Sequence, residues 1–332
     1  MKGSVSRNSS LMPVPAAKPA LNAMAVVLEQ PERIALRELP LDLPGAGDIV
    51  VDMEWSGIST GTERLLWSGR MPAFPGMGYP LVPGYEGVGR VSAAGEASGL
   101  KVGDRVFVPG ARCFGEVRGL FGSAAARVVV QGARVVPVSE RLGERAILLA
   151  LAATALHALE VGREPPQLIV GHGVLGRLLA RLTLLRSSAP PVVWESQRAR
   201  RSGATGYAVV DPAADPRSDY RSICDMSGDG SLLDGLIARL APGGEIVLGG
   251  FYSAPLTFAF PAAFMREARI SVAAQWQPRD LQTVHRLCES GELSLDGLLT
   301  HRASAADAIA AYRQAFTDPD CLKMYLDWSG RS

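Results

Sequence analysis

The fold is decided by the stretch QLIVGHGVLG, residues 167–176, in which an apolar run leads into glycines spaced GxGxxG. Gly171 permits a tight turn, Gly173 lets the backbone approach a pyrophosphate, and Gly176 allows a helix to pack closely on the strand. Val174 and Leu175 complete the turn and open a segment with helical apolar spacing, whose free N–H groups and positive dipole end suit phosphates. The stretch predicts a dinucleotide site, the alternative being an ordinary turn between strand and helix.

An acidic residue follows this turn at the distance that dinucleotide sites require. Glu195 ends the next apolar run, 19 positions after Gly176. A carboxylate there accepts the ribose hydroxyls of NAD and repels the 2′-phosphate of NADP, by about 3 kcal/mol for charges about 5 Å apart at an effective dielectric near 20. NAD is therefore predicted. The opposing observation is a group of basic side chains that could serve a 2′-phosphate or simply begin a solvated helix: Arg198, Arg200 and Arg201.

Outward from the turn, strand-like and helical segments alternate as far as residue 252. Such alternation predicts a parallel, doubly wound sheet of the Rossmann type, here assigned to residues 141–272. At the start of this range, before the glycine turn, residues 144–161 have helical spacing, with Ser139 as the expected N-cap. The predicted class is α/β.

The remaining segments predict a second domain. Short β-rich runs separated by Gly, Pro and Asp predict a compact β-barrel over residues 24–140, to which residues 273–332 are expected to return. Residues 1–23, rich in Ser, Pro, Ala and Asn, are predicted to be a disordered tail.

Composition excludes several classes of protein. The 332 residues carry 34 Lys and Arg against 33 Asp and Glu, and this balance argues against nucleic-acid binding. The longest apolar run, residues 146–156, is shorter than the roughly 20 residues that span a bilayer, so no transmembrane segment or signal peptide is predicted. Four cysteines without metal-ligand spacing indicate a reducing compartment, and a cytoplasmic location is expected.

Three motifs of the first domain resemble the medium-chain dehydrogenase/reductase superfamily: SGISTGTE at 56–63, VPGYEGVGRV at 82–91 and LKVGDRV at 100–106. The resemblance implies a GroES-like barrel joined to a Rossmann domain, with the nicotinamide between them. It also departs from the zinc-dependent members. Ser59 or Thr60 replaces their first cysteine, and Tyr85 replaces their histidine. The third ligand position falls near Ala150 to Ala152, and Cys113 is alone in the lobe that would hold four cysteines. A zinc-free enzyme with no metal site is predicted.

Without a Lewis acid, alcohol oxidation needs a side chain or relay that accepts the hydroxyl proton. The resemblance makes Thr62 the relay hydroxyl and puts Tyr85 in the vacated ligand position, with Glu63 and Glu86 as supporting or proton-accepting carboxylates. His157 is a further candidate, because histidine side chains serve as proton carriers near neutral pH, unless it is a packed or surface histidine. The superfamily also places three residues on the cofactor: Thr154, Gly250 and Phe251.

The run from Trp55 to Glu86 is similar to one branch of the superfamily, the dehydrogenases of photosynthetic bacteria that act on a hydroxyethyl group of a bacteriochlorophyllide. This resemblance implies oxidation of the 3-(1-hydroxyethyl) group of a (bacterio)chlorophyllide to acetyl with NAD. A flat macrocycle needs an apolar, adaptable wall. The candidates for that wall are Trp67, Met71, Phe74, Met77 and Tyr79. Arg64 or Arg70 is the candidate for pairing with a propionate. The alternative is a loop that packs under the barrel.

Superfamily habit further implies a homodimer, and the lipophilic pigment implies a location peripheral to the photosynthetic membrane. Two other functions stay open at this point. One is a zinc-free quinone or enoyl reductase that uses NADPH, and the other is a non-catalytic module that binds pigment or NAD.

Overall fold

The computed structural model describes residues 21–330. Its strands are β1 Asn22–Gln30, β2 Arg33–Pro40, β3 Asp48–Ile58, β4 Leu81–Val82, β5 Gly87–Ala94, β6 Arg105–Val108, β7 Arg118–Gly119, β8 Arg127–Gln131, β9 Val136–Pro137, β10 Leu168–Val170, β11 Val192–Trp194, β12 Ala208–Val210, β13 Tyr220–Asp225, β14 Leu240–Leu248, β15 Arg269–Val272, β16 His301–Ser304 and β17 Met324–Asp327. Its α-helices are α1 Thr62–Trp67, α2 Leu149–Val161, α3 Val174–Arg186, α4 Leu233–Ala238, α5 Phe260–Arg266, α6 Pro278–Ser290 and α7 Ala308–Thr317.

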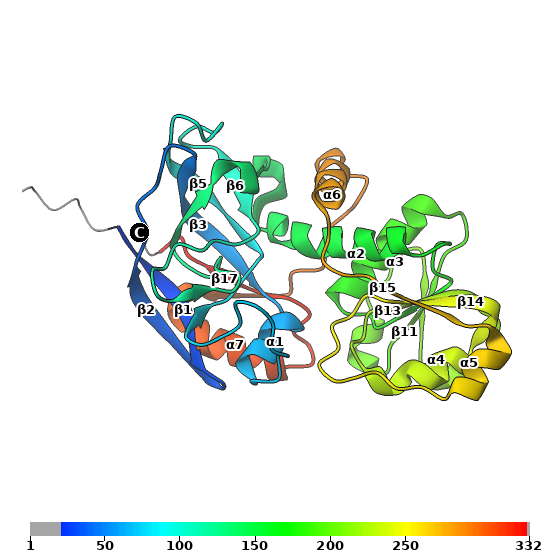
Figure 1. Cartoon of the computed structure of the whole chain (residues 1–332). Coiled ribbons are helices and arrows are strands. Elements are labelled where there is room, and N and C mark those ends of the chain that lie inside the picture. Colours follow the sequence, from blue (N-terminus) through cyan, green and yellow to red (C-terminus); the bar gives the residue numbers. More distant parts are fainter. Residues whose placement is uncertain (1–20, 331–332) are drawn as a thin grey trace, which may run out of the picture.

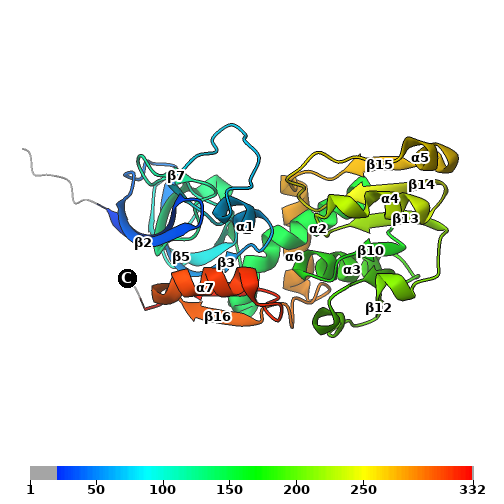
Figure 2. The same cartoon turned by 90° about the horizontal axis from the view of Figure 1, so that it is seen from below.

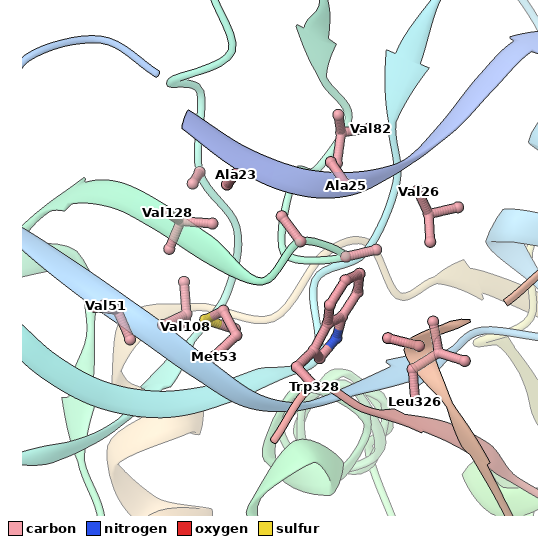
Figure 3. Close-up of a cluster of buried hydrophobic side chains, with 14 of the residues drawn as sticks. Ala23, Ala25, Val26, Val51, Met53, Val82, Val108, Val128, Leu326 and Trp328 are labelled. Atoms are coloured by element: carbon pink, nitrogen blue, oxygen red, sulfur yellow. The ribbon is translucent and has the colours of Figure 1, made fainter. Parts of the chain in front are cut away.

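The first domain is built from two sheets, with orders β2-β1-β4-β7 and β16-β17-β3-β5-β6-β9, and β8 pairs with β3. Alternate side chains of these strands point inward and form one core with Trp328 at its centre (Figure 3). The C-terminal strand β17 pairs antiparallel with β3, so the end of the chain returns to this domain. Figure 2 shows β16 and α7 lying along it.

The second sheet is entirely parallel in the order β12-β11-β10-β13-β14-β15. This is the Rossmann order, in which the strand order reverses between β10 and β13. In such sheets the ligand binds in the crevice at this switch point. Alternate strand residues enter two cores. One core lies under α2 and α3, and the other lies under α4 and α5. The predicted α/β class with a doubly wound sheet is confirmed.

Helix α2 lies between the two sheet systems (Figure 1). It packs on α3 of the Rossmann side and on α6, although α6 belongs to the segment that we assigned to the first domain. The helix predicted over residues 144–161 begins later than expected. Gly143 interrupts 3-10 turns over Glu140–Leu148 before α2 starts. Ser139 does precede those turns, but its hydroxyl donates to Glu289 of α6 and not to a helix N–H group.

The prediction of a tail over residues 1–23 is wrong at its end. Asn22 and Ala23 already pair with Pro40 and Leu39 of β2, and Ala23 is buried in the barrel core. The polar and small residues there resemble a tail in sequence, and only the partner strand gives them a fixed position. Residues 1–20 lie outside the described part of the chain.

One helical stretch within residues 21–330, Glu140–Val161, is long and apolar enough to cross a membrane by length and composition alone. Most of it is buried inside the protein, 67% of its most apolar window, as in the core helix of a soluble protein.

Candidate active site

Three hydroxyl-bearing residues, Ser59, Thr62 and Tyr85, meet at the end of β3 and the start of α1. We call them the hydroxyl cluster. Ser59 Oγ and Tyr85 Oη are 2.8 Å apart, and the Thr62 N–H group donates to Ser59 Oγ at 3.3 Å. Burial and the nearby Glu86 raise the pKa of Tyr85, and hydrogen bonds from Ser59 and Thr62 oppose this shift only in part. Tyr85 is therefore a neutral phenol at physiological pH, able to donate and to accept a hydrogen bond.

Two buried carboxylates stand behind these hydroxyls. Glu63 accepts from the Ser59 N–H group at 3.2 Å and from the Tyr312 hydroxyl at 2.7 Å. Burial raises the pKa of Glu63 to about 7, and the charge of Glu86 adds to the shift. Glu86 is fully buried and pairs with the Lys323 ammonium group. Beyond that ammonium, neither Glu86 oxygen has a hydrogen-bond donor within residues 21–330.

Burial also raises the pKa of Glu86, and the Lys323 charge opposes this. The pair needs Gly57 on β3, because a Cβ there would overlap the Glu86 carboxylate. Lys323 also donates to the Ile58 carbonyl at 3.0 Å. We call Glu63, Glu86, Tyr312 and Lys323 the buried charge cluster.

Sequence analysis predicted Thr62, Tyr85, Glu63 and Glu86, and the structure brings these four together. It missed their C-terminal partners, Tyr312 on α7 and Lys323 before β17. Lys323 carried a usable signal, since it is a cation that directly precedes the apolar strand Met324–Asp327. Lysines are almost never buried without a partner, so this position called for an acid.

His157 does not join the hydroxyl cluster. Its Nδ1 lies 2.9 Å from the carboxylate of Asp280, which also caps the N-terminus of α6. The contact connects α2 to α6, which fits the alternative of a packed histidine. Thr154, on the same helix, is half-buried and donates to the Ala150 carbonyl at 2.9 Å.

The glycine turn, residues 171–176, has the geometry that its sequence predicts. Gly171 has φ +96°, which favours glycine, and a Cβ on Gly176 would overlap the Gly171 carbonyl. Gly173 is the N-cap of α3, and a Cβ there would meet nothing within 4 Å. The open space beside this helix N-terminus fits a pyrophosphate.

The other predicted cofactor residues surround this switch point. Val174 is buried and Leu175 half-buried in the first turn of α3. Gly250 follows β14 so closely packed on Gly228 that a Cβ would crowd its N–H group, and Phe251 beyond it is exposed. Tyr252 then donates to Asp225, at the end of β13, at 2.8 Å.

Glu195 lies at the carboxyl end of β11, next to the glycine turn. Its carboxylate accepts from the N–H groups of His172 at 3.1 Å and Gln197 at 2.8 Å. A carboxylate has about four acceptor sites, so capacity for ribose hydroxyls remains. The residues present therefore fit a dinucleotide.

The proposed pigment wall divides into two groups. Met71 is buried and Trp67 and Met77 pack on core clusters, so the alternative of a loop under the barrel describes these three. Phe74 and Arg70 are exposed. Trp67 and Met77 stay half-exposed, so the buried Met71 is the member of this group least accessible to a substrate.

Within residues 21–330, no three His, Cys, Asp or Glu side chains gather as metal ligands would. Of the residues that the resemblance compares with zinc ligands, Ser59 and Tyr85 bond to each other.

Comparison with known proteins decides the family. The alcohol dehydrogenase GroES-like domain matches residues 45–140. A protein of Rhodobacter capsulatus named 2-desacetyl-2-hydroxyethyl bacteriochlorophyllide A dehydrogenase is 56% identical over 93% of this chain and 99% of its own length. A protein of the same name from Cereibacter sphaeroides is 55% identical over the same shares. The chain belongs to this bacteriochlorophyllide dehydrogenase family.

Solved structures of other dehydrogenases share the fold of this chain. An alcohol dehydrogenase from Escherichia coli CFT073 complexed with NADH has a TM-score of 0.77 and 21% identity, over 92% of this chain and 99% of its own. A dehydrogenase from Sinorhizobium meliloti 1021, described as zinc-binding and bound to NADP, has a TM-score of 0.76, also at 21% identity and over the same shares. The family assignment makes the chain an oxidoreductase that acts on a CH–OH group.

Proposed function

We propose that this dehydrogenase oxidises the 3-(1-hydroxyethyl) group of a (bacterio)chlorophyllide a to 3-acetyl with NAD, without catalytic zinc, in bacteriochlorophyll a biosynthesis. The observation that carries the proposal is the 56% identity to a relative of that name over nearly its whole length. The hydroxyl cluster, which stands where zinc-dependent members hold metal ligands, supports the zinc-free part.

Oxidation removes a hydride from the carbinol carbon and a proton from its hydroxyl. The bound dinucleotide supplies the hydride acceptor. The chain handles the proton: Tyr85 accepts it from the substrate while its own hydrogen passes to Thr62, and half-buried Thr62 releases its own hydrogen to water. Ser59 Oγ, 2.8 Å from Tyr85 Oη, orients the phenol. Each hydroxyl gains one proton and loses one, so none of them becomes charged.

NAD is favoured over NADP by what the neighbouring arginines contact. Arg201 is bound to the Glu195 and Ser196 carbonyls and to Asp211, and Arg200 donates to the Pro319 carbonyl at 3.0 Å. A 2′-phosphate would therefore meet the fixed Glu195 carboxylate with Arg198 alone to offset it.

The test mixes metal-analysed enzyme with 3-(1-hydroxyethyl) bacteriochlorophyllide a and NAD and follows pigment and NADH absorption together. We expect equal growth of NADH and acetyl pigment, unchanged by a zinc chelator. Turnover that requires added zinc would overturn the zinc-free part. Reduction of quinones or enoyl compounds with NADPH would favour the reductase alternative, and binding without turnover would favour the non-catalytic module.

Tyr85→Phe tests the proton relay directly. It removes the hydroxyl that bonds to Ser59 Oγ and keeps the ring against Phe121. Turnover is expected to fall about 100-fold or more, with NAD affinity unchanged, because a positioned proton carrier contributes roughly 10²–10⁴ in rate. Stopped-flow absorbance and NAD titration measure the two quantities, and turnover within about threefold of wild type would exclude the relay.

A homodimer through the Rossmann edge is part of the proposal. β15 ends its sheet, and apolar side chains beside it are 65–75% exposed: Phe260, Phe264, Met265 and Val272. An unpaired edge strand with an exposed apolar patch suits a symmetric partner. Phe264→Asp is expected to give monomers in light scattering, whereas Leu43→Asp on the barrel, also an exposed apolar position, should not.

We further propose a cytoplasmic enzyme at the periphery of the photosynthetic membrane. All four cysteines are free and buried, as a reducing compartment allows. Cell fractionation should recover the protein in the soluble fraction, or on membranes from which salt releases it.

A further inference from the structure

Two side chains at the glycine turn are not used by the proposed chemistry. They are His172 within the turn and Arg177 directly after it. His172 is fully buried between the two first glycines. Its Nδ1 lies 2.6 Å from the Arg200 carbonyl, and its Nε2 lies 2.9 Å from the Tyr207 hydroxyl. Since a carbonyl only accepts, Nδ1 carries the hydrogen, and Nε2 accepts from Tyr207. Burial lowers the pKa of His172, which keeps the ring in this neutral form.

Arg177 is unusual in its position. It lies in the first turn of α3, where the helix dipole disfavours a cation, and it is only 7% exposed. No carboxylate within residues 21–330 forms an ion pair with it, and burial lowers its pKa. Its guanidinium instead donates to three carbonyls, of His172 at 3.0 Å, Arg200 at 3.1 Å and Ser202 at 2.9 Å.

These contacts converge on one segment, residues 196–202, which directly follows Glu195. We infer that His172 and Arg177 act as a clamp that holds this segment against the glycine turn, and that the clamp sets the preference for a dinucleotide without a 2′-phosphate. The inference rests on the proposed use of NAD.

The clamp acts on the cofactor preference through two side chains of residues 196–202, Arg200 and Arg201. With Arg200 held by its carbonyl, its side chain reaches Pro319, and Arg201 lies against Glu195 and Asp211. Both cations are thereby kept away from a 2′-phosphate. Release of the segment frees these side chains, and the Gln197 N–H group no longer fixes the Glu195 carboxylate. His172 and Arg177 are therefore positioning residues and not catalytic ones.

The test compares Arg177→Met with Arg181→Met. Arg181 is a matched control, because it is also a partly buried arginine of α3, but its guanidinium holds the carbonyls of Ser294 and Asp296. The readout is the dissociation constants of NADH and NADPH, measured by fluorescence titration without any pigment. For Arg177→Met we expect the ratio Kd(NADPH)/Kd(NADH) to fall about tenfold, because the two hydrogen bonds to the carbonyls of Arg200 and Ser202 are lost. Arg181→Met should leave that ratio unchanged.

A purely structural role would weaken the binding of both dinucleotides equally, and an unchanged ratio in a folded Arg177→Met would overturn the inference. Arg177→Lys, which keeps the charge but lacks the planar fork, should shift the ratio as Arg177→Met does. If Arg177→Met fails to fold, His172→Phe takes its place, because it keeps an aromatic ring and loses both hydrogen bonds of His172. We expect the ratio Kd(NADPH)/Kd(NADH) to fall in this variant too, and an unchanged ratio would overturn the inference. A wild-type enzyme that binds NADPH as tightly as NADH would overturn the proposed cofactor itself, a result distinct from failure of the clamp.

Discussion

The glycine turn and the buried charge cluster are assembled in opposite ways. The turn takes its geometry from six consecutive residues and from backbone groups, because Gly171 and Gly176 allow approaches that a Cβ would block. The buried charge cluster takes its geometry from side chains that are far apart in sequence, with Glu63 and Glu86 in the first third of the chain and Tyr312 and Lys323 near its end. The backbone geometry of the turn can therefore be predicted from one segment of the sequence. The buried charge cluster cannot be predicted in this way, because its members are distant in sequence.

The largest expected effect is that of Lys323→Met. The substitution leaves Glu86 buried without the ammonium group that pairs with it, which costs about 3–5 kcal/mol in the free energy of unfolding. Urea denaturation measures it. The control is Arg37→Met, which breaks the exposed pair of Arg37 with Glu29 and should cost less than about 1 kcal/mol.

A Lys323→Met enzyme as stable as the control would show that Glu86 stays protonated and does not need the ion pair. The double variant Lys323→Met/Glu86→Gln should recover part of the lost stability, because it removes the unpaired charge as well.

The next effect is a pH dependence that comes from Glu63. Burial raises its pKa from 4.5 to about 7, so between these values the native state binds more protons than the unfolded state. The free energy of unfolding therefore falls as pH rises through this window, by up to about 3 kcal/mol from this group. Below the lower value both states are protonated, and Glu63 contributes nothing.

Glu63→Gln isolates this contribution, since the amide can still bond to Ser59 and Tyr312. The difference in stability between wild type and variant should grow more unfavourable to wild type from pH 5 to pH 7.5 in urea denaturation. A difference that stays constant with pH would mean that Glu63 titrates normally in the native protein.

A smaller effect is the difference in stability between alanine substitutions at two glycines of the turn, Gly176 and Gly173. Gly176→Ala forces a Cβ onto the Gly171 carbonyl, and overpacking against backbone costs about 1–3 kcal/mol. Gly173→Ala meets open space and an ordinary φ of −72°, so its stability should stay within about 0.5 kcal/mol of wild type. Thermal unfolding measures both. Equal losses would show that the turn is not held by the Gly176 contact.

The same contrast explains how much the sequence could predict. The Rossmann sheet and its turn were predictable because the strand, the glycines, the helix and Glu195 follow one another locally. The four acidic and hydroxyl residues of the site were named only through their resemblance to known motifs. Tyr312 and Lys323 were missed because no local pattern links them to residues more than 200 positions away.

Errors arose where tertiary packing decides. Met71 was predicted to line a pigment site, yet it fills a small core with Leu28 and Leu81. An apolar residue in a Gly- and Pro-rich loop suits either place, and its sequence neighbours do not separate the two.

The smallest expected effect is that of a substitution at His157. This residue lies on α2, the helix between the domain of the buried charge cluster and the domain of the glycine turn. Its hydrogen bond to Asp280 connects α2 to α6, and His157→Leu, whose side chain has no nitrogen, should cost about 1 kcal/mol of stability by losing that bond. Asp280 keeps its bond from the Gln277 N–H group, so the cap of α6 should persist.

If the hydroxyl cluster carries the proton, the turnover of the same His157 variant should stay within about twofold of wild type, because the substitution touches neither the cluster nor the glycine turn. Steady-state kinetics across pH 6–9 measures it. A loss of tenfold or more, in a variant of normal stability, would instead make His157 a member of the proton relay and extend that relay from local hydroxyls into α2.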